Sequence, residues 1–190
     1  MLNNFSTRTQ WLIGGSLITL MLLTRGRHLA SIEILPAASW AIFFLAGFYL
    51  RNRLGFPVLF TLAVSIDLIA VTWGGVSNFC ISPAYPFLLP AYGALWFVGR
   101  SLTIVCQFNI KSVALIISGV LLSSFVAELL SSGGFYFFSG RFSETSMSIF
   151  YGRLLQYYPS MLASMAFYVG FAAILHIAFH LNNRSEKVST

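Results

Sequence analysis

Long apolar runs are the feature that most restricts what this chain can fold into. The stretch PVLFTLAVSIDLIAVTWGG, from Pro57 to Gly75, contains a single ionisable residue. A run of this kind matches the roughly 20 apolar residues that an α-helix needs to cross the hydrocarbon core of a bilayer. The rest of the chain has the same character, because 57% of its 190 residues are hydrophobic and only 8% are charged. Soluble domains carry about 25% charged residues, so we expect an all-α membrane protein.

Six such runs predict a single integral membrane domain over residues 1–190, folded as a bundle of six transmembrane helices. Pro36 falls in the first turn of the second run, where a helix tolerates proline. The sixth run is longer than a bilayer requires, so we expect it to be tilted, kinked at Pro159 or extended beyond the membrane. The aromatic segment Gly133–Arg153 predicts an interfacial loop or lid. The expected spans are Thr9–Leu23, Leu35–Leu50, Pro57–Gly75, Phe87–Cys106, Ser112–Ser132 and Leu154–Leu181.

The basic residues predict how the bundle is oriented. Six passes place both termini on one side, and that side has more Arg and Lys than the other, which favours cytoplasmic termini. The net charge of +6 is then explained by orientation and by lipid headgroups, and no basic run is long enough to indicate nucleic-acid binding. The cytoplasmic set is Arg8, Arg51, Arg53, Arg100, Lys111, Arg184 and Lys187, and the outer set is Arg25, Arg27, Arg141 and Arg153.

Asp67 is the strongest anomaly within a predicted span. A carboxylate at the centre of a membrane helix costs about 2.5–3.5 kcal/mol on insertion scales, so it normally has a partner or a task. It is either a hydrogen-bond acceptor between helices or a ligand contact at the bottom of an outward-facing cavity. Arg153 is a candidate partner for it on the outer face. Glu128, near the outer end of the fifth run, is expected to pair with Arg141 or Arg25.

Cys80 lies in the uncharged loop GGVSNFCISPAYP, residues 74–86. It is a buried apolar thiol, a disulfide partner, or a reactive or metal-binding thiol. The only other cysteine, Cys106, is expected at the opposite membrane face, which argues against a disulfide. A single thiolate does not hold a free zinc ion, which takes four ligands, but it can be an axial ligand of a metal held in a macrocycle.

Three further residues are candidates for the outer face. His28 is either a solvated loop residue or a second ligand or proton carrier. Tyr85 is suited to stack on a planar ligand or to donate its hydroxyl. Arg153 either anchors to lipid headgroups or binds a carboxamide, a phosphate or Asp67.

Together these features resemble the BtuM family, which comprises small cobalamin-specific solitary S-components related to energy-coupling factor (ECF) transporters. The resemblance covers essentially the whole chain and is closest in RGRHLASIE, SIDLIAVTWGGVSNFCISPAYP and YGRLLQYYP. It implies an S-component-like fold and uptake of cobalamin (vitamin B12) across the bacterial inner membrane. It also implies that Cys80 is the cobalt ligand and that His28, Asp67, Tyr85 and Arg153 line the corrinoid site.

The resemblance also bears on chemistry and partners. A thiolate donating to cobalt weakens the bond on the opposite face of the corrin, which gives Cys80 a catalytic role in removing an upper cyanide. Docking on an ECF module normally uses a small-xxx-small motif in the first helix. Here Gly15 and Thr19 form only a weak version of this motif. A better version, formed by Ala37 and Ala41, lies in the second predicted helix. The chain therefore acts alone or uses such a module inefficiently. A membrane thiol/quinone redox enzyme, which needs paired cysteines on one face, and a non-catalytic scaffold are the alternatives.

Overall fold

The structure is a computed structural model that describes residues 6–25, 35–74, 81–105 and 109–188, with side chains through residue 179. All regular secondary structure in these ranges is helical, which confirms the all-α prediction. Four segments are long and apolar enough to cross a bilayer, namely α3, η2 together with α4, α5, and residues 147–179 of α6. The chain is therefore a helical membrane protein, and the count of six spans stays a prediction. The elements are α1 (Thr7–Arg25), α2 (Ser39–Tyr49), α3 (Gly55–Thr72), the short 3-10 helix η2 (Tyr85–Phe87), α4 (Leu88–Val105), α5 (Ile110–Phe138) and α6 (Met147–Val188).

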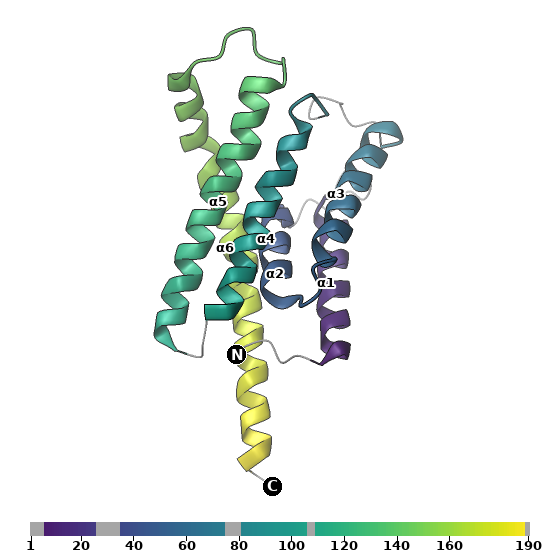
Figure 1. Ribbon diagram of the computed structural model, residues 1–190, viewed down its shortest axis with the longest axis vertical. Coiled ribbons are helices and arrows are strands. Elements are labelled where there is room, and N and C mark those ends of the chain that lie inside the picture. The colour runs from purple at the N-terminus through teal and green to yellow at the C-terminus, as the bar shows by residue number, and fades with distance from the viewer. Residues whose placement is uncertain (1–5, 26–34, 75–80, 106–108, 189–190) are drawn as a thin grey trace.

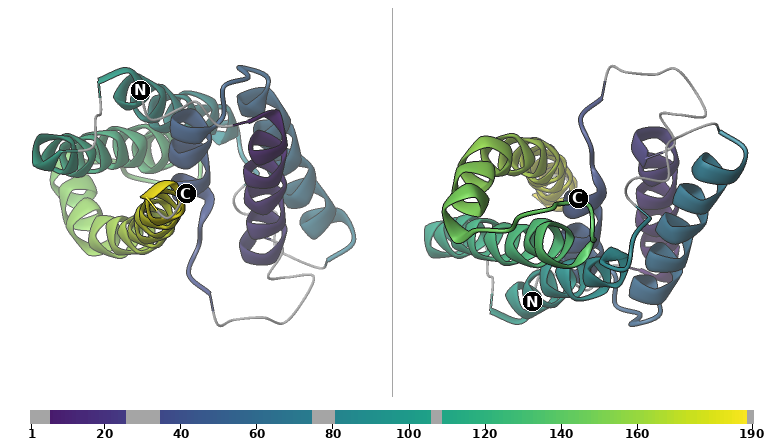
Figure 2. Two further views of the ribbon diagram at one scale, coloured as in Figure 1. Left: turned by 90° about the horizontal axis from the view of Figure 1, so that it is seen from below. Right: turned by 90° about the horizontal axis from the view of Figure 1, so that it is seen from above.

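The helices alternate in direction along the bundle. In Figure 1, α1, α3 and α5 run upward and α2, α4 and α6 run downward. α1 ends and the short α2 begins near the middle of the bundle, whereas α3 and α5 end, and α4 and α6 begin, nearer its upper end. The start of α1 and the end of α6 lie toward the lower end, and the last turns of α6 project below the other helices. The 42 residues of α6 pass through Pro159 as one helix, which follows a curved path in Figure 2. Because proline removes one helical hydrogen bond, it is a natural place for this helix to bend.

The core of the bundle is built around α2. This helix has 11 residues, and all nine from Trp40 to Phe48 are buried, against α4, α1, α6 and α3. A helix that is apolar all round is an interior helix. Its length of about 16 Å is well short of the hydrocarbon core of a bilayer. The second span predicted from Leu35 is therefore wrong at its start, and Pro36 precedes the helix, where its carbonyl accepts a hydrogen bond from Tyr168 Oη at 2.7 Å.

Two glycines let α2 and α4 approach each other closely. A Cβ on Gly47 would collide with the carbonyl oxygen of Trp96, and a Cβ on Gly99 would collide with that of Phe44. Small residues at such crossings are how membrane helices gain close packing without a hydrophobic driving force between them. The α2–α4 contact is the most extensive between any two elements of the described structure.

The predicted loop Gly133–Arg153 is mostly helical, which corrects that prediction. α5 continues to Phe138 and α6 begins at Met147, so that only residues 139–146 connect them. Gly134 lies within α5 against the ring of Phe87, where any side chain would be crowded. Gly140, with φ of 69°, provides the left-handed residue of the connection.

The close crossing of α2 and α4 can be tested with two glycines of the same helix. We expect Gly99→Ala to lower the thermal unfolding midpoint of the detergent-purified protein, because the added methyl group meets backbone atoms that cannot rotate away. Gly93→Ala is the matched control, since a Cβ there meets nothing within 4 Å. It should leave the midpoint unchanged or raise it slightly, because alanine favours helix over glycine by up to about 1 kcal/mol. Equal midpoints for the two variants would contradict the proposed packing.

Candidate functional site

A cavity of about 570 Å³ lies toward the upper end of the bundle, and all six helices contribute to its lining. It is situated over the N-terminal end of α2, because Ala37, Ser39 and Trp40 all line it. A full-length second helix would have filled this space, so the late start of α2 creates the cavity. The remaining lining residues are Thr24, Arg25, Asp67, Ala70, Val71, Ile81, Ala84, Tyr85, Leu88, Tyr92, Glu128, Ser131, Ser132, Phe135, Phe150, Arg153, Tyr157 and Met161.

One side of the cavity is formed by a bidentate ion pair between Arg25 and Asp67. Arg25 Nε donates to Asp67 Oδ1 at 2.7 Å, and Arg25 Nη2 donates to Oδ2 at 2.6 Å. The side chains are only 14% and 24% exposed. The planar guanidinium matches a carboxylate in this geometry, so the pair joins the end of α1 to the middle of α3.

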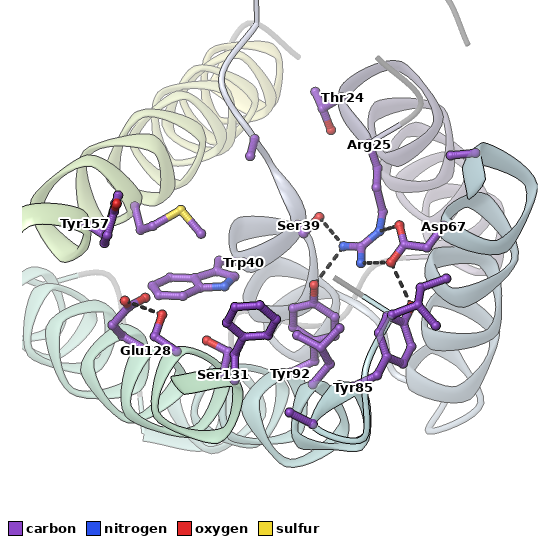
Figure 3. Close-up of a pocket in the computed structure, with 18 of the residues that line it drawn as sticks. Thr24, Arg25, Ser39, Trp40, Asp67, Tyr85, Tyr92, Glu128, Ser131 and Tyr157 are labelled. Atoms are coloured by element: carbon purple, nitrogen blue, oxygen red, sulfur yellow. Dashed lines mark hydrogen bonds and ion pairs between the residues drawn. The ribbon is translucent and has the colours of Figure 1, made fainter. Parts of the chain in front are cut away.

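Three hydroxyl groups complete this cluster. Arg25 Nη1 donates to Ser39 Oγ at 2.9 Å and to Tyr92 Oη at 2.7 Å. Tyr85 Oη donates to Asp67 Oδ2 at 2.7 Å. The network therefore connects α1, α2, α3, η2 and α4, and Figure 3 shows it on one side of the cavity. A charged pair buried this far needs such additional hydrogen bonds, because the pair alone does not recover its desolvation cost.

The opposite side of the cavity is formed by α5 and α6. Glu128 on α5 is 1% exposed, and its Oε1 accepts a hydrogen bond from Ser132 Oγ at 2.6 Å. Figure 3 shows Glu128 and Tyr157 on this side, with Trp40 between them and the Arg25 cluster. The cavity thus has two polar sides separated by an apolar middle.

Arg153 lines the cavity from α6 and is surrounded by aromatic rings. Its Cζ lies 5.0 Å from the ring centroid of Phe142, 5.4 Å from that of Tyr157 and 5.8 Å from that of Tyr136. In the part of the chain that the structure describes, no carboxylate forms a salt bridge with it. The aromatic faces stabilise the cation and leave its N–H donors open to a ligand.

The structure brings together three of the five residues singled out from the sequence. Asp67, Tyr85 and Arg153 line one cavity, whereas His28 and Cys80 lie outside the described residues. Asp67 serves both of the roles considered for it, because it bridges helices and also lines the cavity. Its partner is Arg25, so the pairing with Arg153 considered above is wrong. Glu128 likewise accepts from Ser132 and forms no salt bridge with Arg141 or Arg25 among the described residues.

Sequence reasoning missed several residues of the site. Arg25 was considered only for orientation and as a partner of Glu128, and Ser39, Trp40 and Tyr92 received no role. A signal was present on α5, where Glu128, Ser131, Ser132 and Phe135 follow the i, i+3, i+4, i+7 spacing of one helical face, and all four line the cavity. A polar stripe of this kind in an apolar membrane helix indicates a face turned toward the bundle interior.

A comparison with known protein families finds no match to this chain, and no curated protein matches it either.

The ion pair predicts how the unfolding free energies of single and double variants at Arg25 and Asp67 differ. Asp67→Ala should lower the free energy of unfolding by about 3–5 kcal/mol, because it leaves the guanidinium of Arg25 buried without its counter-ion. The double variant Arg25→Ala/Asp67→Ala should lose clearly less than the sum of the two single variants, since neither charge is then left unpaired. Denaturant unfolding in detergent measures these differences.

Arg53→Ala is the control for the loss of a cation, since Arg53 is exposed in the connection between α2 and α3 and does not line the cavity. It should change stability by less than about 0.5 kcal/mol. Strictly additive losses from the Arg25 and Asp67 variants would show that the two side chains are not energetically coupled.

Proposed function

We propose that this protein binds cobalamin in the cavity and takes it up across the bacterial inner membrane. The observation that supports this most strongly is the convergence of Asp67, Tyr85 and Arg153 on a single cavity, from residues 86 positions apart in the chain. The resemblance to the BtuM family implies that these residues share a site. Cys80 is bonded directly to Ile81, which lines the same cavity.

The chemistry of the lining suits a large amphiphilic ligand. A corrin has broad apolar faces and a periphery of amide groups, and the cavity has apolar residues such as Trp40 and Phe135 between two polar sides. Sites for drug-sized ligands have volumes of about 300–1,000 Å³. Cobalamin is larger than such ligands, so a cavity of about 570 Å³ would hold part of the molecule, with the remainder extending from the upper end of the bundle.

The cobalt would be bound by Cys80. A corrin already provides four equatorial nitrogens, so the protein has to supply only one axial atom, and a thiolate is a strong donor to cobalt(III). Binding of sulfur displaces the nucleotide base from the lower face and weakens the bond to cyanide on the upper face. Cyanide then leaves as an anion with the bonding electron pair, and cobalt stays in the +3 state. His28, three residues after Arg25 in the chain, is placed by the resemblance in the same site.

Uptake requires that the cavity end of the bundle faces outward. The proposed orientation has both termini in the cytoplasm, with Arg8, Arg51 and Arg53 at the inner end, and Arg153 at the outer end. This follows the rule that basic residues accumulate on the cytoplasmic side. Cobalamin and the lipid bilayer are the partners in this proposal, and an ECF energising module is an additional one.

The ligand assignment is tested by the visible spectrum of the purified protein. Protein expressed in the presence of cobalamin should be coloured and contain close to one corrinoid per chain. Cys80→Ala should lose the absorption features of the cobalt–sulfur bond, while Cys106→Ser, expected at the opposite membrane face, should keep them. If Cys80→Ala and the wild type give the same bound-corrinoid spectrum, the thiol is not the cobalt ligand.

The orientation is tested by labelling intact cells. In the Cys106→Ser background, a membrane-impermeant maleimide added from outside should modify Cys80 when no cobalamin is bound. Bound cobalamin should protect it. Labelling that occurs only after the membrane is permeabilised would place the cavity on the cytoplasmic side and contradict uptake.

A further inference from the structure

Glu128 belongs to a second polar cluster that the binding of cobalt does not use. Ser132, Tyr157, Ser160 and Met161 form with it a smaller recess of about 280 Å³, which adjoins the main cavity through Glu128, Ser132, Tyr157 and Met161. Four of these five residues bear a side-chain oxygen. The recess is thus the most oxygen-rich part of the described cavity lining on α5 and α6.

The Glu128 carboxylate has unused capacity to accept hydrogen bonds. A carboxylate has about four lone-pair positions. The described side chains fill one of them, through Ser132 Oγ at 2.6 Å, and none of the described basic residues forms a salt bridge with Glu128. Glu128 lines the cavity, so these unfilled acceptor positions are open to the cavity. A ligand that brings N–H donors into the cavity fills them when it binds.

Arg153 provides the complementary group in the same cavity. Its Cζ lies 5.4 Å from the ring centroid of Tyr157, which is itself a member of the Glu128 recess. Glu128 and Arg153 line the same cavity and form no salt bridge with each other, so neither group neutralises the other. An acceptor on one side and a donor on the other is the pattern that a primary carboxamide satisfies. Its –NH₂ donates to Glu128, and its C=O accepts from Arg153.

We propose that Glu128 and Arg153 together bind one primary carboxamide of the ligand, and that Glu128 determines the preference for a carboxamide over a carboxylate. A carboxylate in the same place could accept from Arg153 but would bring a second negative charge against Glu128 and no N–H donor. Sites built to hydrogen-bond a ligand group reject analogues that lack it, by factors that reach about 10⁴–10⁵. This inference rests on the proposed function, because cobalamin is the ligand whose periphery presents such amides.

The experiment is a binding titration of the full-length protein in detergent. The probes are cyanocobalamin and its three monocarboxylic acids, in each of which one propionamide is hydrolysed. The wild type should bind at least one of the acids about 100-fold or more weakly than cyanocobalamin. Glu128→Gln should reduce that preference to less than about 10-fold, because glutamine has both a donor and an acceptor and no charge. Glu144→Gln, which removes an exposed carboxylate outside the cavity lining, is the control and should keep the wild-type preference.

Glu128→Ala provides a second variant if the glutamine protein does not purify as a single species. It should also abolish the preference for cyanocobalamin. The variant should bind cyanocobalamin more weakly than the wild type does, and it should bind the monocarboxylic acid that the wild type rejects equally well or more tightly. If the wild type binds cyanocobalamin but Glu128→Gln keeps the full preference, the role of Glu128 is wrong and the proposed function stands. If the wild type does not bind cyanocobalamin, the proposed function fails, and this inference fails with it.

Discussion

The bidentate pair between Arg25 and Asp67 is the interaction on which the cavity end of the bundle depends. The side chains are only 14% and 24% exposed, so solvent reaches each charge only in part, and the pair is stabilised by the opposite charge and by hydroxyl groups at the remaining hydrogen-bonding positions. Ser39, Tyr85 and Tyr92 provide these hydroxyl groups. Arg25 and Asp67 come from α1 and α3, and the three hydroxyl groups come from α2, η2 and α4. The hydrogen bonds around one ion pair therefore fix how five elements meet. The same groups form one wall of the cavity, so residues that hold the helices together also line the cavity.

The short α2 explains why this end of the bundle is hollow. Its apolar residues from Trp40 to Phe48 are fully used in packing, and Gly47 and Gly99 bring it against α4. Residues 35–38, directly before α2, are not helical, and the longer helices α5 and α6 form the opposite side of the cavity. The cavity then takes its polar character from the few ionisable residues on the surrounding helices. Arg25 and Asp67 lie on one side and Glu128 on the other, with Trp40 between them.

The membrane class and most helix positions could be predicted from the sequence, because length and apolar composition alone decide whether a segment suits a bilayer. Helix ends were less predictable, as in α2, where Pro36 was placed inside the helix, and in α5, where Gly134 was placed in a loop. Both places make tertiary contacts that a local sequence pattern does not reveal, between Pro36 and Tyr168 and between Gly134 and Phe87. The partner of Asp67 could not be predicted, since no sequence period relates residues 42 positions apart. His28 and Cys80 lie outside the described residues, so their place in the site stays a prediction.

The central claim is that this cavity binds cobalamin with Cys80 on the cobalt. The most direct test is a crystal structure of the protein grown with cobalamin, with anomalous diffraction recorded at the cobalt edge. The account predicts a single cobalt peak at bonding distance from Cys80 Sγ, next to Ile81, with amide groups of the corrin reaching the cavity lined by Asp67 and Arg153. A cobalt peak elsewhere, or crystals of the folded protein that contain no cobalt, would contradict it.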